Sequence, residues 1–149
     1  MIIIASTDAD KAVAYGFLRE HGVMLGMSDD FNALGRLGAD GKLMGVVAFN
    51  SFNGKLCSMH CAGNGNWVSR AFIKAVFHYP FITCGKNYIT ITVAGDNLKS
   101  VKFVRHMGFR VMHRLRDGWD DGVDTVVLMM TRQECRWLPQ EKQDDRKTA

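Results

Sequence analysis

The sequence lacks any apolar run long enough to cross a membrane. Residues 1–5 are apolar, but no basic segment precedes them and polar residues follow at once, so we expect neither a signal peptide nor a membrane span. The chain also lacks internal repeats and low-complexity segments. These absences favour a cytoplasmic protein with no membrane partner.

Clusters of basic residues are also lacking. Lys and Arg are scattered along the chain, and no aromatic RNA-binding motif accompanies them, although the formal net charge is +4. Nucleic-acid binding is therefore only a secondary possibility. A modest positive balance also suits a small polyphosphate cofactor.

The four cysteines are irregularly spaced, and without a secretory signal they are expected to be reduced thiols. Cys57 and Cys61 form a CxxxC pattern, with His60 between them and His78 downstream, which could suggest a metal site. If this segment is a strand, however, the two sulfurs start about 13 Å apart, too far to share one zinc ion. We therefore expect no metal.

The chain has 149 residues and 47% hydrophobic composition, enough for one domain with a substantial core. Residues 139–149 contain no large apolar side chain and are expected to form a disordered tail. The expected organisation is thus a single domain over residues 1–138 followed by that tail.

The first half predicts a strand, a helix and two hairpins. Residues 1–4 favour a strand, and Asp8 or Asp10 can cap a helix that Gly22 ends. Turn residues then separate short apolar runs. Two further antiparallel strands are predicted over residues 43–49 and 55–62, with turns over residues 39–41 and 50–54.

The second half alternates between helical and strand patterns. After the loop 63–66, apolar residues at helical spacing predict a helix over residues 68–77 that stops before Pro80. Asp96 or Asn97 can cap a second helix, which Gly108 ends. Strands are predicted over residues 88–93, 109–115 and 125–130, the last two around an acidic turn over residues 117–124. This order indicates an α+β or mixed α/β fold around one sheet.

Residues 97–109, NLKSVKFVRHMGF, resemble a signature of the GCN5-related N-acetyltransferases, in which Asn opens a helix, a small residue follows three later and Gly-Phe closes it. The order of elements resembles that superfamily too, over roughly residues 2–138. From Gly108 onward the sequence looks like the ribosomal-protein N-terminal acetyltransferases and small bacteriophage-encoded members. The resemblance implies a mostly antiparallel, splayed sheet of about six to seven strands with helices on both faces. It also allows a homodimer.

The resemblance further implies acetyl-coenzyme A (acetyl-CoA) as cofactor, with its phosphates at the loop before the first of these two helices. The first turn of a helix offers unbonded N–H groups and a positive dipole end to an anion. The family has a longer glycine motif where this chain has AGNGNWVSRA, so an ordinary loop between strand and helix is the alternative. The candidate phosphate contacts are Asn64, Gly65, Asn66, Trp67, Val68, Ser69 and Arg70.

By the same resemblance, the pantetheine arm lies between the strands over residues 55–62 and 88–93, bordered by Met59, His60 and Cys61. The side-chain amide of Asn97 would reach it, with Ser100 and Phe103 lining the arm. A plain helix cap is the alternative for Asn97, and both roles can hold together.

His60 is the candidate catalytic residue, because imidazole titrates near neutral pH and can take the proton of an attacking amine. A structural histidine is the alternative. Many family members carry a Tyr that protonates the leaving thiolate, but Val104 stands at that position, with His106 and Tyr88 as fallback acids. The acidic stretch 117–124 could attract a cationic amine or form a charged surface turn.

Two functions remain open from the sequence. The first is an N-acetyltransferase acting on an amine of a protein or a small molecule, which Asn97, Ser100 and the loop favour. The second is a catalytically weak or inactive protein of this fold that binds a host factor, which Val104 favours. A phage-encoded protein would act in the host cytoplasm.

Overall fold

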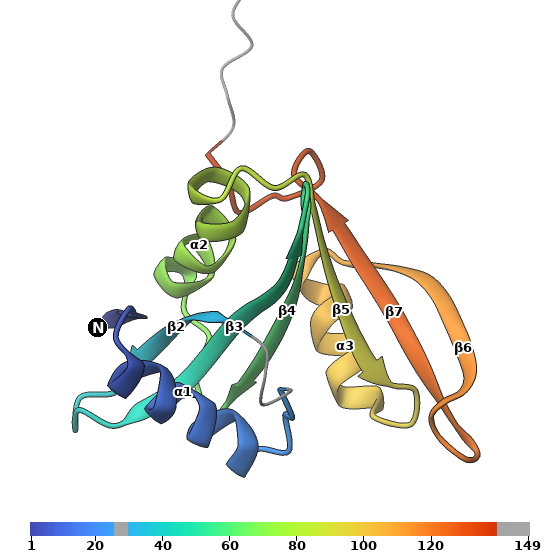
Figure 1. Ribbon diagram of the computed structural model, residues 1–149, viewed down its shortest axis with the longest axis horizontal. Coiled ribbons are helices and arrows are strands. Elements are labelled where there is room, and N and C mark those ends of the chain that lie inside the picture. Colours follow the sequence, from blue (N-terminus) through green and yellow to red (C-terminus); the bar gives the residue numbers. More distant parts are fainter. Residues whose placement is uncertain (26–29, 140–149) are drawn as a thin grey trace, which may run out of the picture.

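The computed structural model describes residues 1–25 and 30–139. Within these residues, seven strands form one sheet in the order β1-β2-β3-β4-β5-β7-β6, accompanied by three α-helices (Figure 1). The elements in chain order are β1 (Ile2–Ala5), α1 (Asp8–Glu20), β2 (Asn32–Leu37), β3 (Leu43–Asn53), β4 (Leu56–Gly63), α2 (Arg70–His78), a π-helical turn (Tyr79–Thr83), β5 (Tyr88–Ala94), α3 (Leu98–Met107), β6 (Arg110–Asp120) and β7 (Val123–Thr131). The predicted α+β class is confirmed. The predicted tail, apart from Pro139, lies outside the described residues.

Helices cover both faces of the sheet, as predicted. Val46 and Ala48 of β3 pack with α1, in a core that includes Leu18 of that helix. Val47 and Phe49, which point the other way, belong to the larger core with α2 and α3. The alternation along β3 therefore defines an α1 face and an α2/α3 face. No helix in the described parts of the chain is long and apolar enough to span a bilayer.

Local capping explains where the helices begin. The predicted cap of α1, Asp8 or Asp10, is wrong: Thr7 is extended and its hydroxyl accepts a hydrogen bond from the N–H of Asp10. The two aspartates lie inside the first turn, where a carboxylate faces the positive end of the helix dipole. For α3 the expected cap, Asn97, and the left-handed C-terminal residue, Gly108, are both confirmed.

Both long hairpins have shorter turns than the sequence predicts. β3 continues to Asn53, and a register shift after Asn50 accommodates Ser51 at a φ of 52°. Likewise β6 and β7 reach almost to Gly122, with Asp117 also at a φ of 52° inside β6. A β-bulge lets a polar, turn-forming residue stay within a strand, so the turns predicted over residues 50–54 and 117–124 are too long: the chain reverses only between Asn53 and Leu56 and between Asp120 and Val123.

β4 and β5 are the only parallel neighbours among the described strands. Their pairing runs only from Leu56 with Tyr88 to Ser58 with Thr90, although β4 continues to Gly63 and β5 to Ala94. Beyond that point the two strands separate, as Figure 1 shows. We call this separation the β4–β5 divergence, and it confirms the predicted splayed sheet.

Candidate functional site

The backbone of β4 presents hydrogen-bonding groups at the β4–β5 divergence. The N–H of Asn64 donates to the carbonyl of Met44 across the β3–β4 ladder at 2.7 Å. Because N–H directions alternate along a strand, the N–H groups of Met59 and Cys61 point to the β5 side. Beyond Ser58, β5 no longer pairs with this edge. The Ser58–Thr90 pair already uses the N–H of Met59, so the carbonyl of Met59 and the N–H of Cys61 are the β4 groups that can serve a ligand instead of a neighbouring strand.

The loop before α2 carries a second set of backbone donors. No acceptor in the described residues receives the N–H groups of residues 65–69. Gly65 has a φ of 55°, and Ser69 caps α2 by accepting from the N–H of Phe72 at 3.1 Å. The arrangement is a run of unbonded donors at a helix N-terminus, which suits an anion.

Two side chains from distant segments hold this loop. His21, just after α1, lies 2.7 Å from the side-chain oxygen of Asn64 through Nε2 and 2.7 Å from the carbonyl of Phe17 through Nδ1. The bond to Asn64 contributes most to raising the pKa of His21, and the bond to Phe17 adds to it. Arg36 of β2 donates to the carbonyl of Asn66. Sequence reasoning missed both residues, because nothing local relates them to the loop.

Trp67 lies flat on two glycines that face each other across the β3–β4 ladder. A Cβ atom at Gly63 would meet the Trp67 ring at 2.1 Å, and one at Gly45 would meet it at 2.5 Å. The ring centroid is 5.7 Å from that of Phe103 on α3. The two glycines thus explain how this loop accommodates the large ring of Trp67, at a position where the N-acetyltransferases that the sequence resembles commonly have a small residue. Trp67 and Phe103 connect the loop to α3.

On α3, Asn97 acts as a helix cap, with its side-chain oxygen accepting from the N–H of Ser100 at 3.2 Å. Its amide nitrogen is left to donate, so the capping and ligand-binding roles are compatible. A cavity of about 540 Å³ opens beside Phe103. Its other lining residues are basic, namely Lys99, Lys102, Arg105 and His106. Sequence reasoning missed Lys99 and Lys102, although their i, i+3 spacing places them on one side of a helix.

His60 projects from the other side of β4. It pairs with Ala48, which packs with α1, so its side chain is on the α1 face, whereas Met59 and Cys61 belong to the α2/α3 face. Its Nε2 atom lies 2.7 Å from the side-chain oxygen of Asn50. His60 is two residues past Ser58, whose hydroxyl lies 3.1 Å from that of Thr90 on the last β4–β5 rung. The predicted base therefore stands where the strands begin to separate.

The nearby thiols are poor nucleophiles. Burial raises the pKa of Cys61 to about 12 and that of Cys57 to about 11, so both stay protonated near neutral pH. Residues 1–25 and 30–139 contain no group of three or more His, Cys, Asp or Glu side chains that could hold a metal ion. The groups that the candidate site offers are backbone donors, the imidazole of His60 and the basic side chains beside Phe103.

The sequence and the structure were compared with those of known proteins. No protein-family profile matches the chain. A curated relative, an uncharacterized N-acetyltransferase of Methanocaldococcus jannaschii, is 25% identical over 103 residues, 65% of each chain. A mutant form of the spermidine/spermine N-acetyltransferase SpeG of Vibrio cholerae superposes with a TM-score of 0.72 at 15% identity, covering 89% of this chain and 94% of that one. The dodecameric SpeG of the same organism gives 0.71 at 14% identity over the same shares.

The chain has the fold of the GCN5-related N-acetyltransferases. The predicted resemblance to this superfamily is confirmed by the curated relative and by the solved structures. The narrower resemblance to bacteriophage-encoded and ribosomal-protein N-terminal acetyltransferases stays a prediction. The loop 63–70 is where the sequence resemblance predicts the phosphates of the cofactor, and the β4–β5 divergence is where it predicts the pantetheine arm.

Val104 is 2% exposed and belongs to the core on the α2/α3 face. It stands at the position where many members of the superfamily have the Tyr that protonates the leaving thiolate. A tyrosine there has to displace its packed neighbours. We expect Val104→Tyr to lower the free energy of unfolding by about 1–3 kcal/mol, because adding atoms to a packed core forces strain. Thermal unfolding measures this change, with Val104→Phe as the matched control. A Val104→Tyr protein as stable as the wild type would contradict the core placement.

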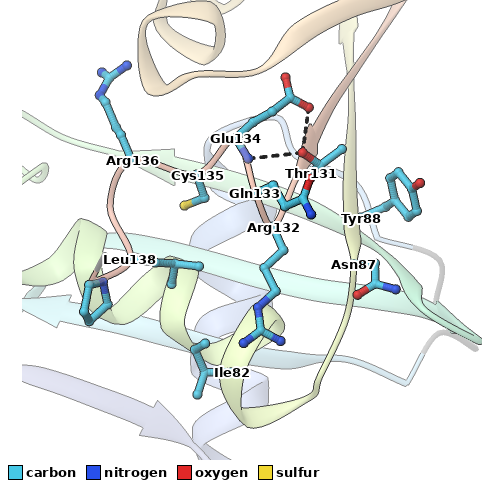
Figure 2. A pocket seen from close by; sticks show the side chains of 11 residues that line it. Ile82, Asn87, Tyr88, Thr131, Arg132, Gln133, Glu134, Cys135, Arg136 and Leu138 are labelled. Atoms are coloured by element: carbon cyan, nitrogen blue, oxygen red, sulfur yellow. Dashed lines mark hydrogen bonds between the residues drawn. The ribbon is translucent and has the colours of Figure 1, made fainter. Parts of the chain in front are cut away.

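A cavity of about 790 Å³ lies at the opposite end of β5, where its first residue Tyr88 pairs with Thr131 of β7 (Figure 2). Glu134, one of its lining residues, accepts from the hydroxyl of Thr131 at 2.7 Å and pairs with Arg110 at 2.6 Å. None of the predicted cofactor residues lines this cavity. It is therefore separate from the candidate acetyl-CoA site.

Proposed function

We propose that this protein is an N-acetyltransferase that transfers the acetyl group of acetyl-CoA to an amine of a protein or a small molecule. The observation that carries the proposal is the run of unbonded N–H groups at residues 65–69, beside the β4–β5 divergence. The curated relative and the similar solved structures are named N-acetyltransferases, which supports the same reaction.

The proposed cofactor site begins at the loop before α2. The N–H groups of Gly65 to Ser69 hold the pyrophosphate, since a helix N-terminus stabilises an anion without side-chain charge. Arg70 is exposed at the start of the helix and can add a charge-assisted bond. Asn64 contributes less directly, because its N–H and its side-chain oxygen are already bonded to Met44 and His21.

The pantetheine arm is proposed to follow the β4–β5 divergence. The carbonyl of Met59 and the N–H of Cys61 meet its amides, and the amide nitrogen of Asn97 donates from the start of α3. Ser100 and Phe103 line the arm from α3. The basic residues Lys99 and Lys102 beside Phe103 add positive charge for a phosphorylated cofactor.

The proposed reaction needs positioning more than covalent help from the protein. Acetyl-CoA supplies an acyl group already activated as a thioester. A β4 N–H at the divergence polarises the carbonyl oxygen, where negative charge develops. On the α1 face, His60 takes the proton that the attacking amine must lose. The polarising donor therefore comes from the backbone edge of β4 that faces β5, and the base comes from a side chain of the same strand on its α1 face.

Binding and turnover are tested separately. Calorimetry should show saturable binding of acetyl-CoA, and thiol release should depend on an added amine. The amine panel includes peptides with free N-termini, lysine peptides and spermidine, since spermidine is named for the similar Vibrio cholerae enzyme. Absence of binding would overturn the cofactor assignment. Binding without thiol release from any amine would favour the noncatalytic alternative, which rests on Val104 alone.

A further inference from the structure

A buried amide accompanies the proposed base. Asn50 is 3% exposed, and its side-chain oxygen lies 2.7 Å from Nε2 of His60. A polar group removed from water is costly unless it is hydrogen-bonded, so a buried asparagine in a strand needs a bonding partner. His60 supplies such a bond. The pair is a built feature of the α1 face and not a chance surface contact.

Strand geometry directs Asn50 toward His60. Asn50 pairs with Ser58 and His60 with Ala48, so the two side chains are diagonal neighbours on one face of the sheet. The register shifts immediately after Asn50, and Ser51 has a φ of 52°. Bulges of this kind re-aim side chains next to functional sites. The irregularity of β3 therefore begins at the residue that contacts the proposed base.

The bond selects one tautomer of the imidazole. A neutral histidine donates from one ring nitrogen and accepts at the other, and an amide oxygen can only accept. With the oxygen of Asn50 facing Nε2, that nitrogen carries the proton and Nδ1 carries the lone pair. When Nδ1 takes a proton from the amine, the Nε2–H bond to Asn50 becomes charge-assisted and stronger.

We infer that Asn50 is a positioning residue, which holds His60 in the Nε2–H tautomer and leaves Nδ1 as the base of the transfer reaction. This inference rests on the proposed function. The proton balance is simple: the N–H bond of the amine breaks, its proton forms a bond to Nδ1, and the Nε2 proton stays between His60 and Asn50 throughout.

Nitrogen NMR tests the tautomer without requiring activity. In the full chain labelled with ¹⁵N-histidine, the His60 signals are assigned by their loss in His60→Gln. The wild type is expected to show the Nε2–H tautomer, and Asn50→Leu, which has similar volume but no acceptor, to show a mixture. An Nδ1–H tautomer in the wild type would overturn the inference, because the amide of Asn50 would then be the donor.

Kinetics test the positioning role. We expect Asn50→Leu to lower kcat by about 10-fold or more with little change in the KM for acetyl-CoA, because Asn50 contacts the base and is not one of the proposed cofactor contacts. Asn50→Asp, which keeps an acceptor at the same place, is expected to retain most of the turnover. In a His60→Ala background, Asn50→Leu should have no further effect on kcat. An equal fall in that background would show that Asn50 acts through folding and not through His60.

The enzymatic activity and the positioning role of Asn50 are tested by different outcomes. A wild type without thioester turnover would remove the proposed function, while the NMR tautomer would still decide whether Asn50 orients His60. A wild type with turnover and the Nε2–H tautomer, but with full kcat in Asn50→Leu, would keep the enzyme and reject the positioning role.

Discussion

Two aspartates in the loop before α2, Gly65→Asp with Ser69→Asp, are expected to lower the affinity for acetyl-CoA by at least about 100-fold, or roughly 3 kcal/mol. Each added carboxylate stands among the N–H groups that are proposed to hold the pyrophosphate, so it occupies their donors and repels the phosphate charge. Isothermal titration calorimetry measures the change directly.

The choice of residues keeps the fold intact. Ser69 caps α2 through its side-chain oxygen, and aspartate caps a helix about as well as serine. Gly65 has a φ of 55°, which Asp and Asn tolerate better than other side chains do. The matched control is Gly65→Asn with Ser69→Asn, nearly the same shape without the charge. Equal affinities of the two folded double variants would show that the phosphates bind elsewhere.

The order of elements was predictable because its signals are local. Helix caps such as Asn97, a left-handed glycine such as Gly108 and the β-branched run of β5 each depend on a few neighbouring residues. The lengths of β3 and β6 were not predictable in this way. Asn50 and Ser51 have turn-forming side chains, and only the pairing with β4 shows that a bulge keeps them within a strand.

The same limit applies to the candidate site. The loop 63–70 and His60 could be chosen from residue type and order, since a donor-rich turn before a helix and a histidine on the strand that precedes this turn are visible in the chain. Their partners could not. His21 and Asn64 are 43 residues apart in the sequence, and Arg36 and Asn66 are 30 apart, so only the folded sheet brings them together.

Strand alternation also divided residues that the sequence had grouped. Met59, His60 and Cys61 were expected to border one arm of the cofactor as a set. In the structure, the outer two face α2 and α3 and the middle one faces α1. Met59 and Cys61 can therefore border the proposed cofactor site together, whereas the side chain of His60 lies on the other face of the sheet.

Replacing His60 with alanine is expected to lower kcat by about 10² to 10⁴-fold, roughly 3 to 5 kcal/mol of barrier, because a general base typically contributes this much. The affinity for acetyl-CoA should change little, since the ring faces α1 and the proposed cofactor contacts are backbone groups and α2/α3-side residues. Steady-state turnover at saturating acetyl-CoA, together with calorimetry, separates the two effects.

The pH dependence decides whether His60 acts as a base or only as packing. Without the imidazole, the amine must lose its proton to water, so turnover of His60→Ala should keep rising with pH until the amine itself is neutral. His60→Gln is the matched control: its side-chain amide can bond to Asn50 and fill the site, but it cannot take a proton near neutral pH. Both variants should therefore lose kcat to a similar extent. If Gln restores the wild-type rate and pH profile, the residue at this position supports β3 and β4, and proton removal occurs through solvent.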